Sequence, residues 1–168
     1  MDELNELGDI LRREIRSFTT VLELLILEEN ALVTGDTATL KGLVNRQEDI
    51  LSSIACLEKS RLDVMVRLGN RVGTPVEELT ASRLAGLADL PLREELLESG
   101  HFRKTLIGEI HHRKQSNSLL INQALLLAES DLRLLYRAAG IETGEGYGGR
   151  MSGPKTGSGS SICVDRTI

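Results

Sequence analysis

Apolar residues recur at alternating steps of three and four throughout residues 40–68. This spacing follows one face of an α-helix, and its seven-residue repeat is that of a coiled-coil seam. The seam consists of Leu40, Leu43, Gln47, Ile50, Ile54, Leu57, Arg61, Val64 and Leu68. A helix with one long apolar face must cover that face, so the pattern predicts packing against other helices.

The composition favours the same all-α fold. Of the 168 residues, 40% are hydrophobic and 27% are charged, yet the chain has only two Phe, two Tyr, three Pro and no Trp. Strands favour aromatic and β-branched residues, whereas leucine supplies most of the apolar content here. A chain of this length is typical of one domain, and its apolar content is sufficient for a core.

A second apolar stripe, also at steps of three and four, predicts a first helix over residues 2–33. Gly35 is expected to end this helix, and the Asp36 side chain is expected to cap the next one. Because so short a connection reverses the chain, the first two helices are predicted to be antiparallel.

The seam ends in the glycine-containing segment 69–73, and a short helix is expected to follow it. Thr74 is predicted to cap this helix, with Pro75 at its first position and Glu77 completing a capping box. The helix is expected to end near Leu87.

A last long helix is predicted over residues 91–139, continuing through Gly100 and Gly108, with a break at Gly100 as the weaker alternative. The composition then changes to glycine and serine with few apolar groups, which cannot offset the entropy lost on ordering. The predicted organisation is a helical coiled-coil domain (1–139) and a flexible tail (140–168). The expected fold is thus an antiparallel bundle of three long helices and one short helix.

Charge and hydropathy exclude several classes of protein. The net charge of −5 argues against a nucleic-acid-binding surface, which needs a basic face. The acidic N-terminus is unlike a secretory signal, and the apolar run 21–27 is too short to span a membrane. Cys56 and Cys163 lie in unlike contexts, and we expect free thiols in a reducing cytoplasm.

Two patterns superficially suggest a catalytic or cofactor site. Residues 144–149 match G-x-G-x-x-G but follow a helix and precede a Gly/Ser-rich tail, unlike a dinucleotide site. The pairs Glu98/His101 and Glu109/His112 resemble the half-sites of di-iron bundles, which require the pairs on different helices. Both pairs belong to one helix, about 16 Å apart, so a solvated polar face is expected. The sequence therefore predicts no enzyme, no cofactor and no metal.

The last helix carries more leucine than one packed face requires. Relative to Asn117, one face is expected to form the seam of the bundle, and it consists of Ile121, Ala124, Ala128 and Leu135. A second stripe lies on the flank and consists of Leu120, Leu127 and Leu134, with Leu119 and Leu126 further round. This flank either packs inside the protein's own core or is exposed to a partner helix.

Three groups of residues together resemble the FlgN-type flagellar export chaperones of bacteria. The first helix ends in Leu25-x-x-Glu28-x-x-x-Leu32-x-x-Gly35-Asp36, and the second contains Glu48-x-x-Leu51 and Leu57-Glu58-x-x-Arg61. The last helix contains Asn117-x-x-Leu120-Ile121, and Tyr147 follows among glycines. The resemblance covers residues 1–149 and depends on the order and spacing of these groups.

This resemblance implies a cytoplasmic chaperone that binds C-terminal helical segments of hook-associated proteins, prevents their premature assembly and delivers them to the export gate. By the same resemblance, the cargo-binding residues are Leu119, Leu120, Leu126, Leu127 and Leu134. It also implies that Tyr147 contacts the cytoplasmic domain of the gate. The alternatives are an adaptor coiled coil that self-associates through its last helix and, more distantly, a metal-dependent bundle enzyme.

Overall fold

The computed structural model describes residues 2–140, which form helices without any strand in that range. In chain order the elements are α1 (Asp2–Thr34), α2 (Thr37–Val72), the 3₁₀ turn η1 (Val76–Glu78), α3 (Ala81–Gly86) and α4 (Leu90–Ala138). The predicted all-α fold with three long helices and one short helix is confirmed. The predicted tail lies outside the described residues, so the division at residue 140 stays a prediction.

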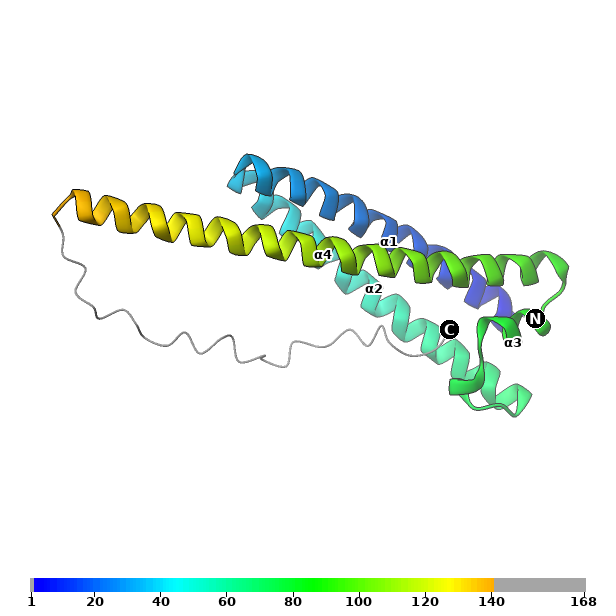
Figure 1. The fold of residues 1–168 in the computed structure, drawn as a ribbon. Helices are drawn as coiled ribbons and strands as arrows, with labels where there is room; N and C mark the ends of the chain where they lie inside the picture. Colours follow the sequence, from blue (N-terminus) through cyan, green and yellow to red (C-terminus); the bar gives the residue numbers. More distant parts are fainter. Residues whose placement is uncertain (1, 141–168) are drawn as a thin grey trace.

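The three long helices are arranged around α1 (Figure 1). α1 and α2 form an antiparallel hairpin, and α4 lies along α1 in the same direction. α1 packs along both α2 and α4, whereas α2 and α4 hardly touch each other. The long helices therefore form three sides of a bundle, in which α1 contacts both of the other two.

The turn between α1 and α2 follows the predicted chemistry. Gly35 has a φ of 69°, in the left-handed region that favours glycine. The Asp36 side chain accepts a hydrogen bond from the Thr39 backbone N–H at 3.0 Å, which satisfies one of the free donors at the start of α2. α4 continues without a break through Gly100 and Gly108, also as predicted.

The segment after α2 differs from the prediction. The chain forms η1 and then restarts as α3, with Thr80 rather than Thr74 accepting the capping bond, from the Arg83 N–H at 3.3 Å. The reason is Leu79, which is almost fully buried against the long helices. Leu79 lies at the turn between the two short elements, and its side chain reaches the core cluster there. The α-helix therefore begins at Ala81 rather than at Pro75.

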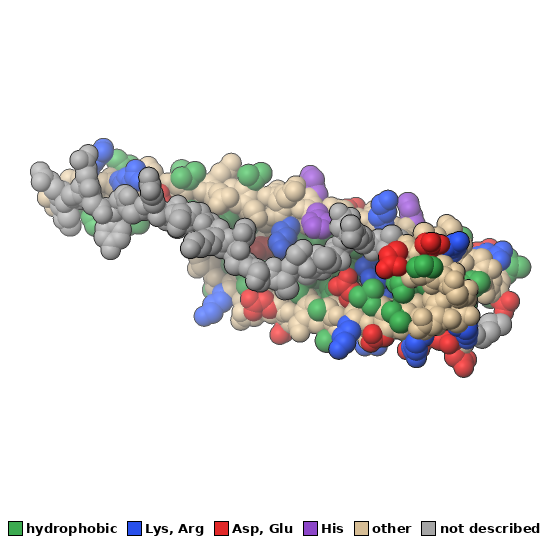
Figure 2. Space-filling model, turned by 90° about the horizontal axis from the view of Figure 1, so that it is seen from below, with side chains coloured by type: hydrophobic (Ala, Val, Ile, Leu, Met, Phe, Trp, Pro, Cys, Tyr) green, Lys and Arg blue, Asp and Glu red, His purple; other side chains and the backbone are tan. Residues whose placement is uncertain are grey.

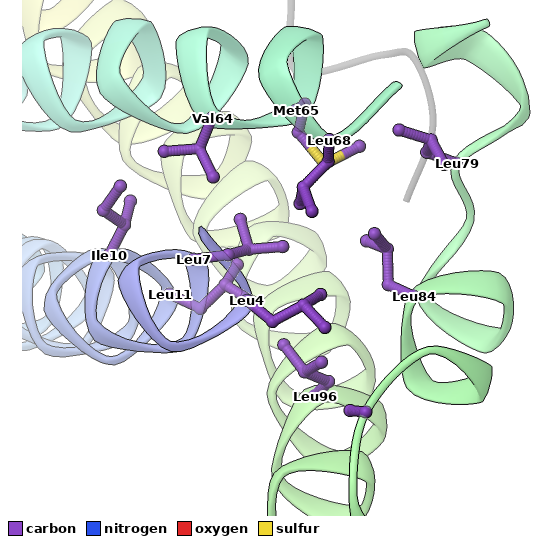
Figure 3. Close-up of a cluster of buried hydrophobic side chains, with 11 residues drawn as sticks. Leu4, Leu7, Ile10, Leu11, Val64, Met65, Leu68, Leu79, Leu84 and Leu96 are labelled. Carbon is purple, nitrogen blue, oxygen red and sulfur yellow. The ribbon is translucent and has the colours of Figure 1, made fainter. Parts of the chain in front are cut away.

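The largest core cluster lies at the end of the molecule that holds α3 (Figure 3). Around its centre, α1 contributes Leu7, α2 contributes Leu68, and α4 contributes Leu96. Leu79 and Leu84 close the fourth side, opposite α1 and between α2 and α4. At this end the short segment therefore occupies the place that a fourth helix has in a four-helix bundle.

At the other end, α4 extends beyond the hairpin (Figure 1). Asn117 of α4 lies beside Glu28 of α1, six residues before α1 ends at Thr34, whereas α4 continues for 21 residues to Ala138. Every residue from 121 to 138 is exposed. The prediction that α4 buries a bundle seam here is therefore wrong for all four of its members, Ile121, Ala124, Ala128 and Leu135. The hairpin turns back too early to cover them.

Candidate partner-binding surface

The exposed end of α4, residues 121–138, is called the extension below. Four of the five leucines predicted to bind cargo are on or just before it and are 59–68% exposed: Leu119, Leu126, Leu127 and Leu134. The fifth, Leu120, is half-buried where the extension meets the hairpin. Figure 2 shows hydrophobic side chains at the surface along this part of α4. The prediction that Leu119 and Leu126 are exposed is confirmed.

The apolar surface of the extension is wider than one helix contact requires. At about 100° per residue, Leu127 and Leu134 project from one flank, and Leu125 and Leu132 from the other, about 160° away. Ala124, Ala128 and Leu135 lie between these flanks. Large apolar patches on a protein surface mark sites of interaction, and this arrangement offers two helix-packing flanks on one helix.

A buried polar group holds α4 in place at the base of the extension. The Asn117 side chain is only 2% exposed, and its Nδ2 donates to the Leu25 carbonyl at 3.0 Å and to Glu28 Oε2 at 2.9 Å. Gln47 Nε2 of α2 donates to the same Glu28 oxygen at 3.2 Å. Glu28 therefore links all three long helices where the extension begins.

A groove with a volume of about 480 Å³ lies between α2 and α4. Phe18 and Leu25 of α1 form part of its floor, while Leu51 of α2 and Ile110 of α4 line opposite sides. The groove is mainly apolar and also contains the polar group at Glu28. The sequence analysis did not predict this groove, because periodicity shows which residues share a face but not whether two neighbouring helices meet.

A second buried polar cluster was also missed. Glu14 is fully buried, and its two carboxylate oxygens accept from Arg61 Nε at 3.2 Å and from Arg103 Nε at 2.9 Å. Burial lowers the pKa of Arg103 below its usual value, although the nearby Glu14 charge acts in the opposite direction. The signal for this cluster was Arg61, which with Gln47 is one of two polar members of the seam and indicated a polar partner without naming it.

The residues that suggested catalysis are exposed or lie outside the described part of the chain. Glu98, His101, Glu109 and His112 are all exposed on α4. Within residues 2–140, no three His, Cys, Asp or Glu side chains are grouped to bind a metal ion. Cys56 is exposed with a free thiol, whereas the glycine motif, Tyr147 and Cys163 lie outside the described residues.

These features define a class of protein: a helical bundle in which, within residues 2–140, the end of a leucine-rich helix is not covered by another helix. None of its described helices is long and apolar enough to cross a membrane. The family model named "FlgN protein" matches residues 1–152, and the chain therefore belongs to the FlgN family. This confirms the resemblance and identifies a chaperone of flagellar type III export. Searches of the curated proteins and of the solved structures gave no match.

Proposed function

We propose that this FlgN-family chain acts in the bacterial cytoplasm and binds C-terminal helical segments of hook-associated proteins. Leu119, Leu120, Leu126, Leu127 and Leu134 are the proposed cargo-binding residues. The observation that carries this proposal is the extension, on which a leucine-rich helix continues past the hairpin without a neighbour among residues 2–140. Bound cargo helices are shielded from assembling prematurely and are then delivered to the cytoplasmic domain of the export gate.

The physical basis is burial of apolar surface on binding. Fully burying one leucine side chain contributes about 1.5–3 kcal/mol relative to leaving it exposed. Several such contacts supply useful affinity after the cost of association, and they do so without a cofactor. Apolar helix packing also remains reversible, as a chaperone that must release its cargo requires.

The test is a pull-down with the full chain from its native cytoplasm, with the bound proteins identified by mass spectrometry. The expected result is enrichment of a hook-associated protein whose purified C-terminal segment then binds directly. The Leu119→Ser/Leu126→Ser variant should lose this enrichment. Recovery of no hook-associated protein, with direct binding also absent, would contradict the proposal.

Tyr147 is proposed to contact the export gate after cargo has bound. Replacing it with Ala should leave cargo affinity unchanged but weaken delivery, because a single aromatic side chain outside the cargo surface acts by docking elsewhere. Export of the hook-associated protein and motility are the measurements, and the matched control is Phe102→Ala, at an exposed aromatic residue of α4 outside the extension and the groove. Wild-type export by the Tyr147 variant would remove this residue from the mechanism.

The alternative function is an adaptor that self-associates through its last helix. The same exposed flanks favour it, since two copies of the extension would cover each other's leucines. Sedimentation of the purified chain over a wide concentration range separates the two functions. A stable dimer without cargo would favour the adaptor, whereas a monomer that forms a complex with cargo would favour the chaperone.

A further inference from the structure

The place of a fourth helix is filled at only one end of the bundle. Leu79 and Leu84 of the η1–α3 segment occupy it between α2 and α4 near the N-terminus of α1. Beyond this segment α2 and α4 still hardly touch, and the groove of about 480 Å³ lies between them. In the described part of the chain, the long helices thus form three sides of a four-helix bundle, and the fourth side is open beyond α3.

The groove has the lining that a helix-packing site requires. Its floor and sides are apolar residues of all three long helices, including Phe18, Leu51, Ile107 and Ile110. Of these, Leu51, Ile107 and Ile110 are only half-buried. A guest helix would complete the burial of these side chains, as a fourth helix does in a bundle.

The groove is continuous with one flank of the extension. Ile107 and Ser118 line the groove and project from the same side of α4 as Leu125 and Leu132, given about 100° per residue. Along α4, this side extends for 25 residues from Ile107 to Leu132, which is about 38 Å. The groove and this flank therefore form one track along α4, separate from the flank of Leu127 and Leu134.

Glu28 provides a buried carboxylate on this track. Glu28 is nine-tenths buried and lines the groove, and both of its hydrogen-bond donors, Gln47 and Asn117, are neutral amides. Among the described residues, no Lys or Arg nitrogen lies within 4.0 Å of it. A guest helix would remove the remaining water, and a buried carboxylate is tolerated only when a positive charge or further donors compensate it. Asn117 Oδ1 is also buried without a hydrogen-bond donor.

We propose that the groove binds one amphipathic helix of the partner protein, which carries a Lys or Arg side chain in its apolar face at the level of Glu28. This helix completes the four-helix bundle and continues along the Leu125 and Leu132 flank. The inference rests on the proposed function, because its partner is the cargo. It adds a binding track on the side of α4 away from Leu127 and Leu134, and it defines the charge of the helix that fits there.

The experiment uses the full chain and, as the probe, the C-terminal helical segment of the hook-associated protein, with affinity measured by calorimetry. Ser118→Trp places a large side chain in the groove from an exposed position, so the fold should be retained. We expect it to weaken binding by about tenfold or more. The matched control is Ser52→Trp, at an exposed serine of α2 that does not line the groove. It should bind as the wild type does.

The charge is tested by Glu28→Gln, which keeps an oxygen for Gln47 and Asn117 but removes the negative charge. We expect this variant to lose about fivefold or more in affinity. The matched control is Glu23→Gln, at an exposed glutamate of α1 that does not line the groove, and it should bind as the wild type does. Circular dichroism and the melting temperature check that each variant is folded.

The outcomes of these experiments distinguish the groove proposal from the proposed function. Wild-type affinity in Ser118→Trp, with binding lost in Leu119→Ser/Leu126→Ser, would overturn the groove proposal and leave the proposed function standing. Wild-type affinity in Glu28→Gln, or an equal loss in Glu23→Gln, would overturn the proposal that the partner supplies a positive charge at Glu28. Failure of the wild-type chain to bind the segment would overturn the proposed function and the groove helix with it.

Discussion

Two buried carboxylates each link the three long helices through hydrogen bonds. Glu14 of α1 accepts from Arg61 of α2 and Arg103 of α4, whereas Glu28 accepts from amide side chains of the same two helices. Leucine contacts tolerate small shifts along a helix, but a carboxylate with a donor on either side does not. The hydrogen bonds of Glu14 and Glu28 therefore fix how α2 and α4 are aligned along α1. This alignment also determines how far α4 extends past the hairpin.

Glu14→Ala should be strongly destabilising. The substitution leaves Arg103 largely buried without its acceptor and leaves Arg61 with Glu58 alone, at 3.7 Å. Breaking a buried ion pair in this way costs about 3–5 kcal/mol. Urea denaturation measures the loss. The control is Glu29→Ala, which breaks a half-exposed pair with Arg113 and should cost about 1 kcal/mol or less. Equal losses in the two variants would show that the Glu14 cluster does not stabilise the fold.

The exposed leucines should behave in the opposite way. Leu119→Ser/Leu126→Ser is expected to cost about 1 kcal/mol or less in unfolding free energy, because both side chains are already mostly exposed. Cargo binding should weaken by about 1–3 kcal/mol, since these leucines become buried in the complex. Leu24→Ser, in the core, should instead cost about 2–5 kcal/mol in stability. A double variant that fails to fold would place Leu119 and Leu126 in the core.

At the level of the helices, periodicity and turn residues predicted most of the fold. The first helix, its end at Gly35, the Asp36 cap and the unbroken last helix all match the structure. These features are local, because each depends on residues close together in the chain. The same reasoning placed Leu135 in a packed seam, although it is 65% exposed. A pattern on one helix shows which face is apolar, but the length of its neighbour decides whether that face is covered.

Asp36 gives the start of α2 a pH dependence. Hydrogen bonds from the Thr39 side chain and backbone lower the pKa of Asp36 below its usual value. The ionised side chain therefore stabilises the folded state at pH values above the unfolded pKa, and this contribution is lost as the pH falls through the lower folded pKa. The melting temperature of Asp36→Ala should be below that of the wild type at neutral pH.

The difference in melting temperature between the wild type and Asp36→Ala should shrink as the pH falls below about 4. Asp36→Asn is the control, because an asparagine caps a helix well but does not titrate in this range. A melting-temperature gap between wild type and Asp36→Ala that stays constant down to pH 2 would show that the charge of Asp36 plays no part. Thermal melts of the three proteins over this range provide the measurement.

On the scale of the whole molecule, the two ends of the bundle differ in how completely their helices are covered. The α3 end is closed by four elements around one core, whereas the other end has an open groove and an uncovered helix. A helix in the groove would cover only the flank of Leu125 and Leu132, because Leu127 and Leu134 project from the opposite flank. Cargo that uses both flanks must therefore bring two helices, and the closed end keeps the fold stable while they exchange.

Truncation tests whether the extension contributes to cargo binding without contributing to the stability of the fold. A chain that ends after Leu120 removes the extension but none of the described buried core, so its melting temperature should stay close to that of the full chain. Its helical circular dichroism should fall by the share of residues 121–138, and its cargo binding should be lost.

A chain that ends after Gly140 is the control and should keep both its stability and its cargo affinity, because the residues beyond it are rich in glycine and serine. A large drop in melting temperature after the first cut would mean that the extension supports the bundle. Unchanged cargo affinity after the same cut would place binding in the groove alone, and a drop after the second cut would show that residues beyond 140 pack onto the helices.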